Sequence, residues 1–187
     1  MASGDAVWQH GAMSLIEHYR AMARYNLWMN ERLYAACAKL SEVDRRRDVG
    51  GFFGSVHGAL NHILLADCAW LIRLTRDDQY RARSADGQVI QIKSLDQILY
   101  EDFADLSANR SSLDQKICTW AEALSEAATS ATLEYKDSRG TPYSHPAWYA
   151  MSHMFNHQTH HRGQVTALLF QLGQDPGITD LAVMLRA

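Results

Sequence analysis

Apolar residues recur at steps of three and four along four long stretches of the chain, which is the spacing of an amphipathic α-helix. These stretches cover residues 14–39, 53–75, 94–128 and 146–173. The Gly50-Gly51 pair breaks the chain between the first two stretches. Because the connections are short or of medium length, the pattern predicts an all-α fold, a single four-helix bundle.

Local sequence signals place the ends of several helices. Ser94 followed by Gln97 is the pattern of a capping box, which predicts that the third helix starts there. Gly173 suits the position just after the end of the fourth helix. Thr179 is expected to cap a short last helix that ends near Leu185.

The remaining segments have other patterns. Residues 77–92 are polar and predict a loop. Residues 133–135 alternate between apolar and polar, and a turn at 137–140 follows, so we expect a small β-hairpin before the last long helix. Residues 1–13 lack periodicity, so we expect an irregular N-terminal extension, followed by one domain over 14–187.

Composition excludes several classes of protein. The chain has 187 residues, 47% of them apolar, which is enough for one buried core. A net charge of −3 and the lack of a long basic run argue against nucleic-acid binding. No stretch of about 18 apolar residues predicts a transmembrane helix. The three cysteines, Cys37, Cys68 and Cys118, are far apart and lie in helical patterns, and we see no secretory signal, so we expect a cytoplasmic protein with reduced thiols.

Histidines cluster in the fourth helix. Four of the nine in the chain, His153, His157, His160 and His161, lie within residues 151–164. His157 and His161 are one helical turn apart and share a face, so they suit a single metal ion. A zinc peptidase of the HExxH type would have Glu after His157, but Gln158 stands there, which argues against that class. Ordinary surface or hydrogen-bonded core histidines are the alternative interpretation.

A metal site needs at least one more ligand, and His57 and His62 of the second helix are the candidates. They are five residues apart and therefore point in different directions. His57 borders a stripe of bulky apolar residues. His62 shares its face with small residues that leave room for an ion, namely Ser55, Gly58, Ala59, Ala66 and Ala69. Helical geometry therefore favours His62.

Three other polar residues have a candidate role near this site. Asp67 lies on the apolar stripe of the second helix, where a buried carboxylate needs a partner. Arg162 is turned away from His157 in a similar way, so an Asp67–Arg162 pair is one possibility and a partly exposed Asp67 is the other. Gln164 follows His161 by three residues and is a candidate to line the site, or an ordinary polar helix residue.

Four segments together resemble the DinB/YfiT-like superfamily of metalloenzymes. They are residues 18–28, 54–67, 155–164 and 173–177, and Asn-His-x-x-His-His-Arg-Gly-Gln is the most specific run. The resemblance implies an up-down-down-up four-helix bundle, commonly a homodimer. It also implies His62, His157 and His161 as ligands of a divalent metal. His57, His153 and His160 are left as neighbours of the site.

The resemblance also implies what such a site does. Three histidine ligands leave positions open for water or substrate. We expect the bound metal to be zinc or nickel, with iron, copper or manganese as alternatives. Relatives include transferases and isomerases that use low-molecular-weight thiols, so we expect a metal-dependent enzyme, a transferase, isomerase or hydrolase, that acts on a thiol or small electrophile. A stress-associated metal-binding or interaction protein without catalysis is the alternative.

Overall fold

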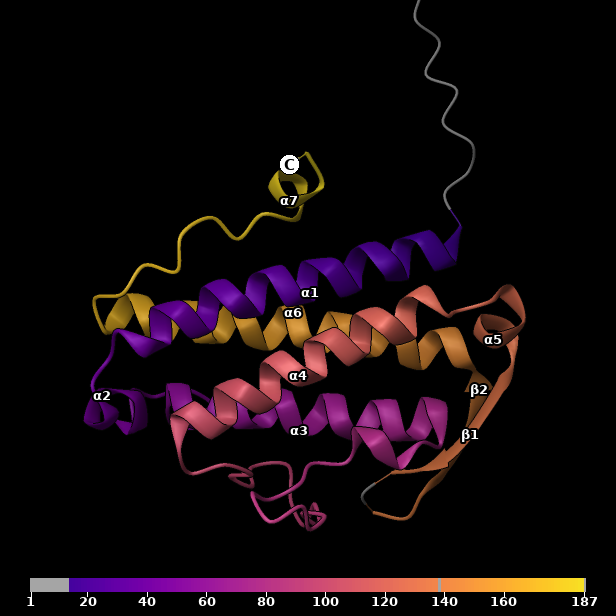
Figure 1. The fold of residues 1–187 in the computed structure, drawn as a ribbon, viewed down its shortest axis with the longest axis horizontal. Coiled ribbons are helices and arrows are strands. Elements are labelled where there is room, and N and C mark those ends of the chain that lie inside the picture. The colour runs from indigo at the N-terminus through magenta and orange to yellow at the C-terminus, as the bar shows by residue number, and fades with distance from the viewer. Residues whose placement is uncertain (1–13, 138, 187) are drawn as a thin grey trace, which may run out of the picture.

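Four long helices form the body of the protein in the computed structural model, which describes residues 14–137 and 139–186. The long helices are α1 (Leu15–Ala38), α3 (Val56–Thr75), α4 (Phe103–Glu122) and α6 (Ala147–Gln171), as Figure 1 shows. The short elements are α2 (Glu42–Arg46), the 3-10 turn η1 (Asp78–Tyr80), α5 (Glu126–Ser130) and α7 (Leu181–Arg186). The expected extension at 1–13 lies outside the described residues.

The directions of the helices follow from the pairs of side chains in contact. On α1 and α4, Asn26 donates to Asp114 while Tyr34 stacks on Phe103, so the two helices are antiparallel. On α3 and α6, the ring of His62 lies beside that of His157 and Trp70 lies beside His153, so this pair is antiparallel too.

Figure 1 shows the resulting path along the bundle: α1 and α6 run one way, and α3 and α4 run the other way. The order is therefore up-down-down-up, and the predicted fold class is confirmed. No helix within the described residues is both long and apolar enough to cross a membrane.

Local signals explain where the helices begin and end. Ser14 and Glu17 form a reciprocal capping box at the start of α1. The Ser55 side chain accepts from the Gly58 amide at the start of α3. Gly173 adopts φ +72° just after α6, a conformation that favours glycine. The predicted end of α6 is therefore confirmed.

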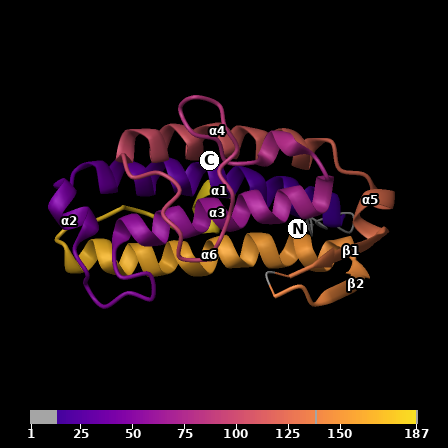
Figure 2. The ribbon, with the colours of Figure 1, turned by 90° about the horizontal axis from the view of Figure 1, so that it is seen from below.

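A two-stranded hairpin precedes α6, as the alternating pattern predicted. Strands β1 (Thr132–Lys136) and β2 (Pro142–Pro146) pair antiparallel, with Tyr135 opposite Tyr143. The rings of these two tyrosines stack with their centroids 5.5 Å apart. The hairpin lies beside the end of α3 and the start of α6 (Figure 2).

The predicted start of the third helix at Ser94 is wrong, because α4 begins at Phe103 with Asp102 as its cap. The Gln97 side chain accepts from the Lys93 amide and closes a turn in a loop instead. The predicted continuation to residue 128 is also wrong, because α4 ends at Glu122 and α5 follows as a separate short helix.

Asn61 explains why the segment before α4 stays a loop. Its Oδ1 accepts from the amides of Leu99 and Tyr100 at 2.9 and 3.0 Å, and its Nδ2 donates to the carbonyl of Tyr100 at 3.3 Å. Asn61 is fully buried on α3, and Leu99 and Tyr100 are buried with it. A buried amide that satisfies these backbone groups outweighs a local capping signal. Figure 2 shows the loop lying across α3.

Replacing Asn61 with Ala should destabilise the protein and loosen this loop. Two buried N–H groups lose their acceptor, so we expect a loss of about 2–4 kcal/mol in the free energy of unfolding. Urea denaturation measures the loss, and hydrogen exchange at Leu99 and Tyr100 should become faster. The control Gln97→Ala, in the same loop, should cost less than about 1 kcal/mol. Equal losses in the two variants would contradict this role of Asn61.

Candidate metal centre

Three histidines from two helices converge at the middle of the groove between α3 and α6. They are His62 of α3 and His157 and His161 of α6. One ring nitrogen of each lies within 4.8 Å of the other two. The Nε2 atoms of His62 and His157 are 3.1 Å apart. The antiparallel packing of α3 on α6 thus brings together the residues that the sequence proposed as ligands.

Hydrogen bonds on the far side of two rings fix which nitrogen faces the cluster. His62 Nδ1 donates to the carbonyl of Leu95 at 2.7 Å, and His161 Nδ1 donates to Oε1 of Gln164 at 2.8 Å. Since Nδ1 carries the proton in both rings, Nε2 keeps its lone pair. His157 differs, because its buried Nδ1 has no hydrogen-bond partner among the described residues.

All three imidazoles are held in the neutral form. Burial lowers the pKa of His62 and His161, and burial with the neighbouring histidines lowers that of His157 to about 3. Neutral imidazole is the form that binds metal. Tetrahedral zinc with nitrogen ligands separates them by about 3.3 Å, close to the 3.1 Å between two of the Nε2 atoms. The residues present therefore fit a divalent cation.

The cluster borders an open pocket of about 590 Å³. Phe53 stacks on His62 with ring centroids 3.8 Å apart, and Phe52 is 84% exposed at the rim. Asp96 supplies the one carboxylate of the lining. The complete lining is Phe52, Phe53, His62, Leu95, Asp96, His157, His160, His161 and Gln164. An open pocket of this size admits a small molecule to the histidines.

The structure places the other candidate residues in different positions. His160 and Gln164 line the pocket, and Gln164 Nε2 donates to His160 Nε2 at 3.1 Å. His57 is buried outside the lining, where its Nε2 donates to the carbonyl of Tyr100 at 3.0 Å. His57 therefore anchors the loop before α4.

Asp67 is fully buried and pairs with Arg110 of α4 at 2.6 Å. The suggested Asp67–Arg162 pair and the partly exposed Asp67 are therefore both wrong. Arg162 instead donates to Asn26 of α1. Asp67 is not among the pocket-lining residues and lies in the core that joins the helices.

Sequence patterns missed the residues that shape the pocket. Phe53 and Leu95 fell inside predicted helices, but both belong to loops that cross the groove at His62. The position of the loop that carries Leu95 depends on Asn61, whose contacts with Leu99 and Tyr100 span 38 and 39 residues along the chain. No local pattern carries that information.

Two comparisons with known proteins agree with this architecture. The profile of a family described as "DinB family" matches residues 13–187. Protein DinB of Bacillus subtilis (strain 168) is 23% identical over 161 residues, which are 86% of this chain and 90% of that protein. The match covers most of the chain and confirms the resemblance found in the sequence.

Replacing Gln164 with Ala should weaken metal binding. The acceptor that orients His161 is lost, so we expect an affinity for Zn²⁺ about 10–100-fold lower. Competition with a chromophoric chelator measures it. Gln164→Glu keeps an acceptor and should restore binding, and Asn156→Ala, at an exposed position of α6, should have no effect. Equal affinity of Gln164→Ala and Asn156→Ala would contradict the positioning role.

The ring of His157 should stay neutral in the metal-free folded protein down to about pH 5, because burial lowers its pKa far below the usual value of about 6.5. Proton NMR of the imidazole, assigned with His157→Ala, follows the titration. In concentrated urea the same signal should titrate near the usual value. A folded-state midpoint close to that of the unfolded chain would refute the buried, neutral state.

Proposed function

Because the chain belongs to the DinB family, we propose that it is a metal-dependent enzyme in which His62, His157 and His161 bind one divalent cation. One observation carries the proposal: three neutral imidazoles converge on one wall of an open pocket. Zinc or nickel suits three nitrogen ligands best, and iron, copper or manganese are alternatives. With ligands on one side only, positions remain open for a substrate.

The bound cation would act as a Lewis acid and lower the pKa of a thiol or water. The chain's own residues prepare the site for this chemistry. Leu95 and Gln164 orient two of the rings through their Nδ1 atoms. Phe52 and Phe53 supply apolar walls that displace water from a bound ligand.

The proposed reaction is thiol transfer to a small electrophile. The sulfur of a low-molecular-weight thiol forms a bond to an electrophilic carbon, the leaving group departs with the electrons of the broken bond, and the thiol proton passes to solvent. An isomerase follows instead if the sulfur adds to one carbon of a double bond while a proton adds to the neighbouring carbon, and both leave again after rotation about the resulting single bond. The open pocket of about 590 Å³ has room for both reactants.

A metal-binding protein without catalysis is the second candidate. It is favoured by the lining of the pocket, in which Asp96 is the one carboxylate and is exposed to solvent. No buried acid or base other than histidine lines the pocket. A homodimer, which the family resemblance implies, is part of both proposals, and sedimentation equilibrium measures it.

Single alanine variants test the metal site. Elemental analysis of purified protein should show about one metal ion per chain, lost in His157→Ala and His161→Ala and strongly reduced in His62→Ala. His153→Ala, one turn earlier on α6, is the matched control and should keep its metal. At a metal concentration 100 times Kd the ion stabilises the fold by about 2.7 kcal/mol, so a chelator should lower the melting temperature. Unchanged metal content in all three variants would contradict the proposed metal site.

Catalysis is tested with the metal-loaded protein, glutathione and an activated aryl halide. Loss of the free thiol should depend on the protein and disappear in His157→Ala. If the protein holds metal and turns over no pair of thiol and electrophile, the second candidate replaces the first.

A further inference from the structure

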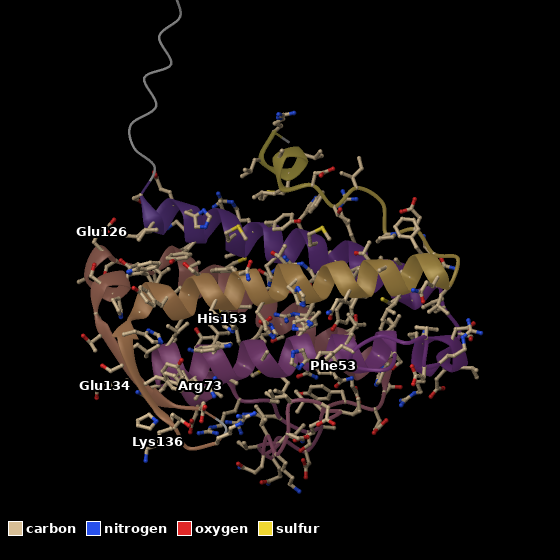
Figure 3. The ribbon with its side chains drawn as sticks, turned by 180° about the vertical axis from the view of Figure 1, so that it is seen from behind. Phe53, Arg73, Glu126, Glu134, Lys136 and His153 are labelled. Carbon is tan, nitrogen blue, oxygen red and sulfur yellow. The ribbon has the colours of Figure 1, made fainter. Side chains whose placement is uncertain are left out.

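A second pocket, of about 410 Å³, opens on the same face under the hairpin. Its walls come from α3, both strands and the first turns of α6, and they are largely aromatic. The residues that matter most are Trp70, Arg73, Tyr135, His145, Tyr149 and His153. Figure 3 shows Phe53, His153 and Arg73 on this face of the molecule, which α3 and α6 form together.

Arg73 lies beside two aromatic rings in this pocket. Its Cζ lies 4.8 Å from the ring centre of Trp70 and 5.3 Å from that of Tyr135. These ring contacts do not use the N–H groups of the guanidinium, which form a fork that matches a carboxylate. Among the described residues, no carboxylate lies within 4 Å of Arg73 and no hydrogen bond engages its guanidinium.

The ring of His153 lies between this pocket and the histidine cluster and contacts rings of both. The ring of His153 lies 4.9 Å from Trp70 and 5.8 Å from His157, centre to centre. His157 lines the first pocket and His153 lines the second. A ligand that joins the two pockets has to pass the ring of His153, and a molecule of tripeptide size, whose backbone extends about 10 Å, is long enough to do so.

We propose that the pocket under the hairpin is a second subsite of the same active site, in which Arg73 binds the carboxylate of a thiol whose sulfur lies at the three histidines. The orientation of the ligand rests on the proposed function. A carboxylate fits better than a phosphate, because the lining offers one arginine and also contains Asp137, which repels a doubly charged group. The aromatic walls suit the peptide-like or apolar body of such a thiol.

The subsite is tested with cobalt-loaded protein, glutathione and glutathione diethyl ester, in which the carboxylates are neutral. The thiolate-to-cobalt absorption band reports the sulfur at the metal, and calorimetry gives Kd. Wild type should prefer glutathione over the diester by about tenfold, the worth of one charge-assisted hydrogen bond. Arg73→Met should remove this preference, and Arg73→Lys should retain part of it. The control Lys136→Met, a charge of the same hairpin, should keep it (Figure 3).

The outcomes separate the two proposals. Equal affinity of wild type for glutathione and its diester, or an equal loss for both in Arg73→Met, overturns the subsite. A cobalt band without dependence on Arg73 leaves the proposed function standing and removes the subsite alone. A preference for glutathione that depends on Arg73, without any cobalt band, keeps the carboxylate subsite and overturns thiol binding at the histidines. 2-Mercaptoethanol, which has no carboxylate, should bind wild type and Arg73→Met equally.

Discussion

A buried cluster of charged and amide side chains fixes how the four long helices align. Arg110 of α4 pairs with Asp67 of α3 at 2.6 Å and with Asp114 of its own helix at 2.7 Å. Asn26 of α1 donates to Asp114 and accepts from Arg162 of α6. Leaving one buried charge unpaired costs roughly 3–5 kcal/mol, so a shift of any one helix along its axis is strongly disfavoured.

The three-histidine cluster depends on that alignment. Asp67 follows His62 by five residues on α3, and Arg162 follows His161 directly on α6. The charged cluster therefore lies on one side of these two helices and the histidine cluster on the other. By fixing α3 and α6 along their axes, the first cluster sets the 3.1 Å separation of Nε2 atoms in the second.

Sequence periodicity predicted what is local or repeats along one helix: the four long helices, the hairpin, the end of α6 at Gly173 and the shared face of His157 and His161. It failed where distant contacts compete with local preference. Ser94 and Gln97 have the spacing of a capping box, which locally favours a helix. Asn61 nevertheless holds Leu99 and Tyr100 in a loop through hydrogen bonds to their amides. The partner of Asp67 could not be predicted either, because Arg110 lies 43 residues away on another helix.

The separation of the two clusters has a chemical consequence. The three histidines are neutral, and Asp67 and Asp114 are already neutralised by arginines within the core. In the proposed site, a divalent cation among three neutral imidazoles would keep its full double charge, and the exposed Asp96 is the one carboxylate of the pocket lining. The positions left open on such a cation would therefore favour an anionic ligand such as a thiolate or hydroxide over a neutral one. Arg73 adds a second site for a negative group, because its guanidinium lines the pocket under the hairpin.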